Sequence, residues 1–133
     1  MRYVLDASVA VAALRKTEPG HVDALRRCMP LFAGRDEIVV PAIFDIEVVS
    51  ALVRRGAAAA SVERFFEKHF GSRRLVTIGP RAARGARAIA SSTRLRAADA
   101  LYVWLAARES LPLITADVEV LQRGASACQV QGP

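Results

Sequence analysis

The sequence contains few cysteines, histidines and lysines, and it lacks several common catalytic motifs. Cys28 and Cys128 are the only cysteines among 133 residues, and without a CxxC pair they exclude a disulfide framework or a zinc ribbon. No GxGxxG or GxxxxGK(S/T) loop is present to bind a nucleotide, and GxSxG and HExxH are also absent. The two histidines, His21 and His69, lie in polar, helical stretches, which gives little support to histidine acid–base catalysis.

Long apolar runs are also lacking, which excludes a membrane span and a signal-peptide core. The first apolar run follows Arg2 and already ends at Asp6. Hydrophobic residues nevertheless make up 53% of the chain and charged residues 24%, so it can bury a core and is not a disordered tail. We therefore expect a cytoplasmic protein in which residues 1–133 form a single domain.

The charge balance is basic, and arginine supplies almost all of the positive charge. Lys+Arg number 19 against 13 Asp+Glu, which gives a net charge of +6, and Lys16 and Lys68 are the only lysines. A domain of this charge suits a polyanionic partner, of which nucleic acid is the commonest. The arginine content fits either phosphate binding or biased codon usage.

Short apolar runs alternate with helical patterns along the whole chain. This order predicts an α/β domain with a mostly parallel central sheet. Within the second helical stretch, Pro30 is expected to end the helix early or to kink it. The expected strands are 2–5, 37–40, 75–78, 112–115 and an edge strand at 128–130, and the expected helices are 9–14, 18–33, 42–55, 57–70, 81–91, 97–109 and 117–123.

Four acidic residues occupy positions where a carboxylate is costly. Asp6 directly follows the first strand and Asp117 closely follows the strand at 112–115, so both should face the edge where parallel strands end. Glu47 lies among apolar residues of a helix, and Asp99 opens the helix at 97–109. Taken singly, Asp6, Asp99 and Asp117 could each cap a helix, but Glu47 is not placed as an N-cap.

Four carboxylates on one edge would repel one another unless protons or a cation neutralise them. With no histidine or cysteine nearby, their oxygens suit Mg²⁺ or Mn²⁺ better than Zn²⁺. A water-rich site of this kind is suited to hydrolysing a phosphodiester, because the metal activates water and holds the phosphate oxygens. The basic remainder of the chain would attract the rest of the polyanion.

Four segments, in this order, resemble the motifs of the PIN-domain family: Tyr3-Val4-Leu5-Asp6-Ala7-Ser8, the stretch from Pro41 through Glu47 to Leu52, Ala98-Asp99-Ala100-Leu101-Tyr102, and Thr115-Ala116-Asp117. Within that family, the size and order resemble the VapC toxin of bacterial VapBC toxin–antitoxin modules. The resemblance implies a PIN-like (Rossmann-like) three-layer α/β/α fold and a Mg²⁺-dependent endoribonuclease, with Mn²⁺ as a possible substitute. It also implies a homodimer and a cognate VapB-type antitoxin whose C-terminal segment wraps the toxin and can block its site.

Carried over by position, the resemblance makes Asp6, Glu47, Asp99 and Asp117 the catalytic acidic quartet, with Asp6 and Asp99 as the metal ligands. Ser8 and Thr115 would support the pocket through their hydroxyl groups. Arg94 and Arg96, just upstream of Asp99, are candidate RNA contacts or part of a solvated surface.

Aromatic residues gather in the stretch from Val62 to Phe70. Core packing is the first interpretation of this stretch, and a groove for an antitoxin helix or a dimer face is the second. Tyr102 and Trp104 are expected to be core or dimer contacts rather than base-stacking platforms.

Other functions compete with the ribonuclease hypothesis. A receiver-like phosphoacceptor would need a lysine near the site, and a haloacid-dehalogenase-like phosphatase would need an aspartate where Ser8 stands. The remaining alternatives are a non-catalytic nucleic-acid- or protein-binding α/β module and a related metal-dependent DNA nuclease. Nothing in the sequence identifies a residue that reads a 2′-hydroxyl group.

Overall fold

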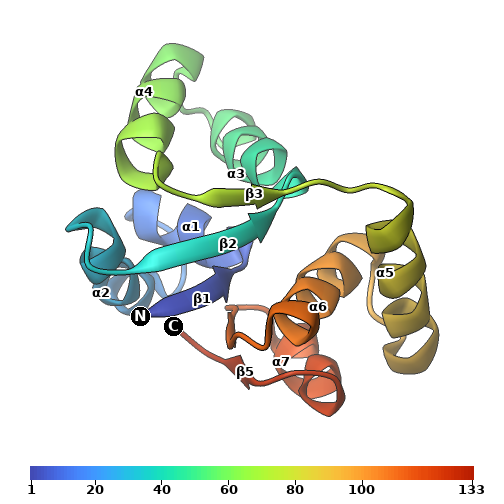
Figure 1. The fold of residues 1–133 in the computed structure, drawn as a ribbon. Helices are drawn as coiled ribbons and strands as arrows, with labels where there is room; N and C mark the ends of the chain where they lie inside the picture. Colours follow the sequence, from blue (N-terminus) through green and yellow to red (C-terminus); the bar gives the residue numbers. More distant parts are fainter.

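Five short strands, all parallel, form one central sheet with the order β3-β2-β1-β4-β5 (Figure 1). The computed structural model describes residues 1–133. The strands are β1 (Arg2–Leu5), β2 (Glu37–Pro41), β3 (Arg74–Val76), β4 (Leu113–Ile114) and β5 (Val130–Gln131). In the middle of the sheet, β1, β2 and β4 are almost wholly buried, which explains their nearly continuous apolar sequences. The predicted α/β fold is confirmed, and the sheet is entirely parallel.

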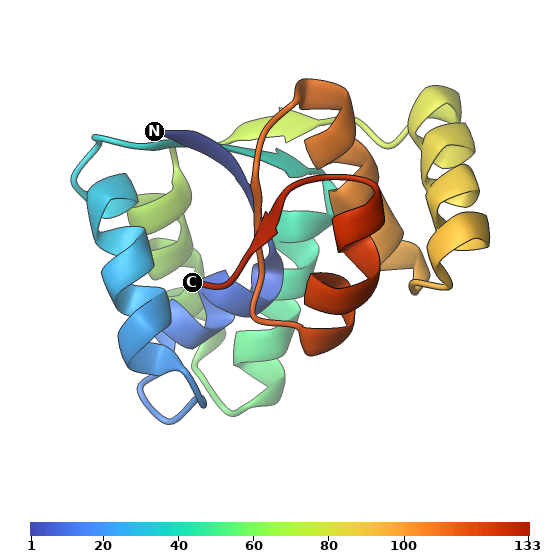
Figure 2. The same cartoon turned by 90° about the horizontal axis from the view of Figure 1, so that it is seen from below.

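Helices cover both faces of the sheet and give the predicted three layers. On one side lie α1 (Ala7–Leu14), α2 (His21–Phe32), α3 (Ile43–Arg54) and α4 (Ala59–Phe70), and on the other α5 (Pro80–Thr93), α6 (Ala97–Glu109) and α7 (Val118–Arg123) (Figure 2). A short 3-10 helix (Gly124–Ser126) follows α7. None of these helices has the length and apolar character needed to cross a membrane.

Two prolines lie near the ends of secondary-structure elements. Pro30 lies in the last turn of α2, which continues to Phe32, so the expectation that it ends the helix early was wrong. Its carbonyl also accepts the backbone N–H groups of Arg35 and Asp36, which orders the turn after the helix. Pro41 is the last residue of β2, and α3 begins two residues later at Ile43.

The aromatic stretch on α4 divides into two faces. Val62, Phe66 and Phe70 are buried, and Phe70 packs edge-on against Phe44 of α3 at 5.7 Å between ring centroids. Core packing is therefore confirmed for these residues. Phe65, on the other face of α4, remains 53% exposed and stacks in parallel with His69.

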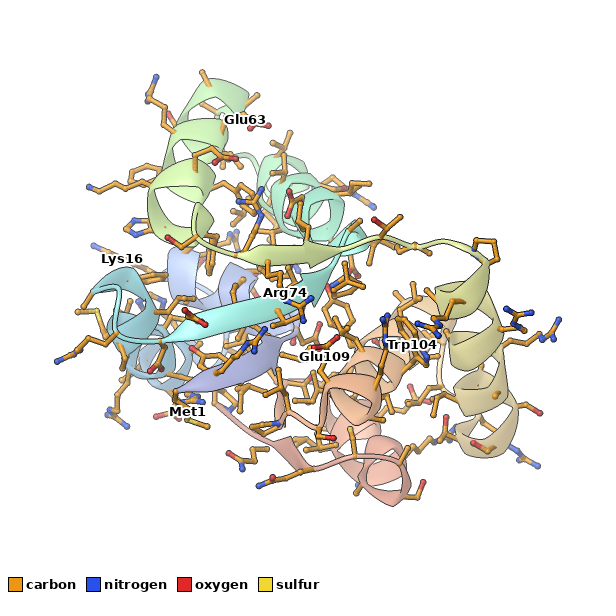
Figure 3. All side chains as sticks on the ribbon, viewed as in Figure 1. Met1, Lys16, Glu63, Arg74, Trp104 and Glu109 are labelled. Atoms are coloured by element: carbon orange, nitrogen blue, oxygen red, sulfur yellow. The ribbon has the colours of Figure 1, made fainter.

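Two arginines after α4 connect the layers. Arg73 binds Asp45 of α3 with both ends of its guanidinium group, and its Nε lies 2.7 Å from Asp45 Oδ1. Arg74 of β3, the edge strand beside β2, pairs with Glu109 at the end of α6, and Figure 3 labels both side chains. The edge strand is thus tied to both helical layers.

Candidate functional site

The carboxyl ends of β1 and β4 meet, as their parallel pairing requires. The Asp6 backbone N–H donates to the Ile114 carbonyl at 2.9 Å, which places the residue after β1 beside the end of β4. The hydroxyl groups of Ser8 and Thr115 both donate to Asp6 Oδ2, and the Ser8 bond is 2.9 Å long. The Ala116 N–H donates in turn to Ser8 Oγ at 3.2 Å. Two segments from opposite ends of the chain therefore hold one carboxylate.

Asp6 is the most deeply buried member of the predicted quartet, with 6% of its surface exposed. Burial raises its pKa, the hydrogen bonds from Thr115 and Ser8 oppose this rise, and the charge of Asp117 adds to it. Asp6 also caps α1, but only through a 3.4 Å bond from the Ser8 N–H to Oδ1. Because both hydroxyl groups bind Oδ2, Oδ1 keeps capacity for a further ligand.

Glu47 reaches the same region from α3, and a tyrosine of α6 holds it there. The Tyr102 hydroxyl donates to Glu47 Oε1 at 2.7 Å. Burial raises the pKa of Glu47, the Tyr102 hydrogen bond lowers it, and the charge of Asp6 raises it further. The Glu47 carboxylate is therefore fixed in orientation and lies within electrostatic reach of Asp6.

Asp99 lies in the first turn of α6 but does not cap it, since the N-cap is Arg96. Burial, followed by the charges of Asp6, Asp117 and Glu47, raises the pKa of Asp99 to about 6, while Arg96 opposes the shift. The four predicted carboxylates thus interact electrostatically, and the charges of the other three all raise the pKa of Asp99.

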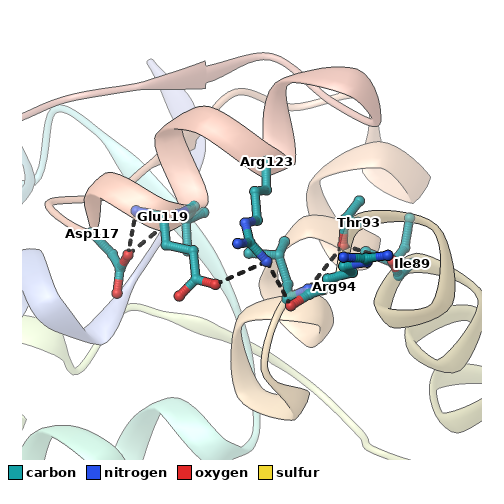
Figure 4. Close-up of polar contacts among 8 residues, drawn as sticks. Ile89, Thr93, Arg94, Asp117, Glu119 and Arg123 are labelled. Atoms are coloured by element: carbon teal, nitrogen blue, oxygen red, sulfur yellow. Dashed lines mark hydrogen bonds and ion pairs between the residues drawn. The ribbon is translucent and has the colours of Figure 1, made fainter.

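Asp117 caps α7, as one interpretation of the sequence expected. Its Oδ1 accepts the N–H groups of Glu119 at 2.8 Å and Val120 at 3.2 Å (Figure 4). Its own N–H donates to Thr115 Oγ1 at 3.1 Å, which joins it to the hydroxyl that binds Asp6. The cap does not remove its charge from the site, because that charge raises the pKa values of Asp6 and Asp99.

The donor set suits a hard divalent cation. In this arrangement no group of three or more His, Cys, Asp or Glu side chains lies close enough to hold one metal ion. Mg²⁺ commonly binds only one or two protein carboxylates and completes its shell with water and substrate phosphate, so a two-carboxylate site is sufficient. Burial is the first cause of the raised pKa of Asp99 and repulsion by the other carboxylates is the second, and a bound cation would relieve that repulsion.

The two predicted RNA-contacting arginines lie at the junction of α5 and α6. Arg94 closes α5 in the left-handed region, with φ of 60°, and its carbonyl accepts the Arg123 guanidinium at 3.2 Å (Figure 4). Arg96 is exposed and close enough to Asp99 to lower the pKa of that carboxyl. Of the two, only Arg96 therefore shows an interaction with the acidic residues.

Tyr102 is the site residue whose polar role the sequence analysis missed, since it was expected only as a core or dimer contact. It is buried, but its hydroxyl serves Glu47. Its spacing was the available indication: Tyr102 follows Asp99 by three residues, so both share one face of α6.

Replacing Asp99 with asparagine is expected to stabilise the protein in the absence of metal. When folding raises the pKa of a carboxyl, that group destabilises the fold at pH values above its folded-state pKa, because it must then be charged in the folded protein. At pH values below its unfolded-state pKa the group is neutral in both states and has no such effect. The shift to about 6 corresponds to roughly 3 kcal/mol at face value, which solvent screening of this half-exposed group reduces to about 1 kcal/mol. Thermal unfolding in EDTA should show a higher Tm for Asp99→Asn at pH 7.5. An equal increase in Tm at pH 4 would contradict this explanation, because the carboxyl of wild-type Asp99 is then largely neutral in the folded protein.

Comparison with known proteins gives one family and several related folds. The PIN domain family model matches residues 3–125. The structure is similar to VapBC2 from Rickettsia felis bound to a promoter DNA fragment (TM-score 0.73, 14% identity, 100% of this chain and 99% of that one covered). It is also similar to the sarcin-ricin loop cleaving toxin VapC20 from Mycobacterium tuberculosis (0.73, 15%, 96% and 96%) and to PAE2754 from Pyrobaculum aerophilum (0.68, 24%, 99% and 92%). No curated protein sequence matched the chain.

Proposed function

Because the chain belongs to the PIN-domain family, we propose that it is a Mg²⁺-dependent endoribonuclease that hydrolyses RNA phosphodiester bonds. The observation that carries this proposal is the electrostatic interaction of Asp6, Glu47, Asp99 and Asp117 at the carboxyl edge of the sheet. Mn²⁺ would suit the same oxygen donors. Residues 1–133 would act as one PIN domain in the cytoplasm.

Each residue of the site has a distinct part in this mechanism. Asp6 and Asp99 would hold the metal, with Ser8 and Thr115 fixing Asp6 through its other oxygen. When bound, Mg²⁺ supplies a water of lowered pKa and neutralises charge on the phosphate. Glu47, oriented by Tyr102, would accept a proton from the attacking water, and Asp117 would add negative charge that favours cation binding.

The biological role that we propose is the toxin of a type II toxin–antitoxin system. Support comes from the structural neighbours, which include a toxin and toxin–antitoxin complexes. The partners would be an RNA substrate, a cognate VapB-type antitoxin and a second copy of the chain.

An apolar groove offers a place for the antitoxin. It has a volume of about 530 Å³ between α1, α2 and α4, and Leu25, Met29, Phe32 and Phe65 contribute to its lining. Met29 and Phe65 are each about half exposed, at 51% and 53%, and because they line the same groove they form an apolar patch of the kind that marks interaction sites. We propose that an apolar helix of the antitoxin binds there.

A second apolar surface, on α3, would serve the homodimer. Ile46 is 69% exposed and Val53 39% exposed, and together with Val49 they line a hollow of about 480 Å³ beside α4. An isologous contact between two copies would cover this face. The same helix, α3, also carries Glu47. In such a dimer the candidate sites of the two copies would therefore lie on adjacent α3 helices.

The direct test is RNA cleavage by the purified chain with and without divalent metal. We expect a single-stranded RNA to be cut in Mg²⁺ or Mn²⁺ and to remain intact in EDTA, with activity restored when metal is added back. A DNA strand of the same sequence serves as the comparison substrate. An RNA that stays intact at every metal concentration would contradict the proposal, and preferential cutting of DNA would support the nuclease but not its substrate.

Tyr102→Phe should reduce cleavage without abolishing it. The change removes the hydrogen bond that orients Glu47 and lowers its pKa, so the pKa of Glu47 rises. Loss of such an outer contact typically costs about 10-fold to 100-fold in activity. Because a higher pKa delays ionisation, the acidic limb of the pH–rate profile should move to higher pH. An unchanged profile with reduced activity would indicate a packing effect alone.

A further inference from the structure

A cleft runs from Glu47 along α3 to the end of that helix. Its first part, about 340 Å³, lies between α1 and α3 and is lined by Ser8, Glu18, Glu47 and Arg55, among others. Its second part, about 550 Å³, is lined by Glu47, Ser50, Ala51, Arg54 and Arg55. Because Glu47, Ala51 and Arg55 border both parts, they form one continuous depression, the α1–α3 cleft.

The far end of the α1–α3 cleft is positively charged and held in place. Arg55 Nε lies 2.7 Å from Glu18 Oε1, and its Nη1 donates to the Ala51 carbonyl at 3.1 Å. Glu18 also binds Arg15 at 2.9 Å, so one carboxylate faces two guanidinium groups. Arg54 is exposed and has no ionic partner. Three arginines against one glutamate leave an excess of positive charge.

The spacing of residues along α3 sets the distance between the acidic and the basic ends of the α1–α3 cleft. Seven residues separate Glu47 from Arg54, which is about 10 Å at 1.5 Å per residue and two turns of the same helix face. The helix dipole alone explains arginines at a helix end. It does not explain why Arg55 turns back toward α1 to border the same cleft as Glu47.

We infer that Arg54 and Arg55 bind backbone phosphates of a single-stranded RNA next to the phosphate that is cut. The inference rests on the proposed nuclease function and names where its substrate lies. Guanidinium groups bind phosphate oxygens through paired N–H donors, and Arg55 is already oriented by Glu18. Small side chains along the cleft, Ala7, Ala12 and Ala51, let a nucleotide chain approach closely. Arg94 and Arg96, from the α5–α6 side, would contact a different part of the strand.

The test compares the full chain with Arg54→Ala/Arg55→Ala and with Arg26→Ala/Arg64→Ala. The second variant removes the same charge from exposed arginines of α2 and α4, outside the cleft. Binding of a fluorescent single-stranded RNA is measured by anisotropy in EDTA across a range of salt concentrations. The cleft variant should bind at least 10-fold more weakly, while the control variant should stay within about 3-fold. The slope of log K against log salt should fall by about 1.4, at roughly 0.7 for each phosphate contact on a single strand.

Kinetics and a single substitution complete the test. In Mg²⁺ the cleft variant should raise KM with kcat nearly unchanged, because its arginines bind the substrate away from the reacting phosphate. Arg54→Ala, which breaks no ion pair, should lower the salt slope by about 0.7 and decides the question if the double variant fails to fold. Equal binding and equal slopes for the cleft and control variants would overturn the inference. If the wild-type chain cuts RNA in that case, only this inference fails; if it cuts none, the proposed function fails.

Discussion

Asp6→Asn is expected to lower the rate of RNA cleavage by more than about 100-fold while leaving the fold intact. Asparagine has the shape of aspartate and can still accept the hydrogen bonds of Ser8 and Thr115, so the connection between β1 and β4 persists. The substitution removes the negative charge that would hold the metal. Mutation of the residues that hydrogen-bond to a metal ligand typically lowers activity about 10-fold to 100-fold, and loss of the ligand itself should lower it further.

The measurement is the initial rate of cleavage at saturating Mg²⁺, together with the Tm of each variant. Asp23→Asn is the matched control, because Asp23 is exposed on α2 and pairs only with Arg26. It should retain wild-type activity. The Tm of Asp6→Asn in EDTA should not fall, since a buried and mutually repelled carboxylate becomes neutral. Wild-type cleavage by a folded Asp6→Asn protein would rule out Asp6 as a metal ligand.

Phe65→Asp should weaken antitoxin binding by about 100-fold or more without affecting cleavage. Phe65 is half exposed, so the fold tolerates a charge there, whereas the bound antitoxin would bury it in an apolar groove. Loss of a central aromatic contact alone costs about 2 kcal/mol or more, which is roughly 30-fold in affinity. The unpaired charge adds to this loss.

The experiment uses the product of the neighbouring open reading frame as the antitoxin. Its affinity for each toxin variant is measured by calorimetry, and cleavage is followed in its presence. Ala83→Asp, an exposed apolar-to-acidic change on α5, is the control on the opposite side of the sheet. Phe65→Asp should cut RNA even with antitoxin present, while the control should remain inhibited. Unchanged affinity in Phe65→Asp would place the antitoxin outside the groove.

The sequence predicted the fold best where the local pattern and the tertiary environment agree. The strand Arg2–Leu5 and the helix Ala97–Glu109 have the predicted bounds, because one is an unbroken apolar run and the other a strong helix former. The weakly patterned strands are shorter than predicted. The run from Leu75 to Ile78 became β3 at Arg74–Val76, whose limits follow from pairing with β2 rather than from its own residues.

For the candidate site, topology allowed part of the arrangement to be anticipated. The meeting of Asp6 with the end of β4 follows from the rule that parallel strands end at one edge, and the structure confirms that meeting. The hydrogen bond between Glu47 and Tyr102 joins two helices from opposite faces of the sheet, and no local pattern specifies their relative rotation. The catalytic and metal-binding roles of the quartet stay predictions until cleavage is measured.

The hydrogen bond between Asp6 and Thr115 spans 109 positions of the chain, which has a consequence for biosynthesis. A nascent polypeptide emerges from the ribosome with β1 first, long before β4 is made. Until β4 enters the sheet, Asp6 lacks its Thr115 and Asp117 neighbours, and contacts between such distant parts of a chain form more slowly than local ones. The proposed nuclease site would therefore stay incomplete until residues 113–117 have been synthesised and have joined the sheet.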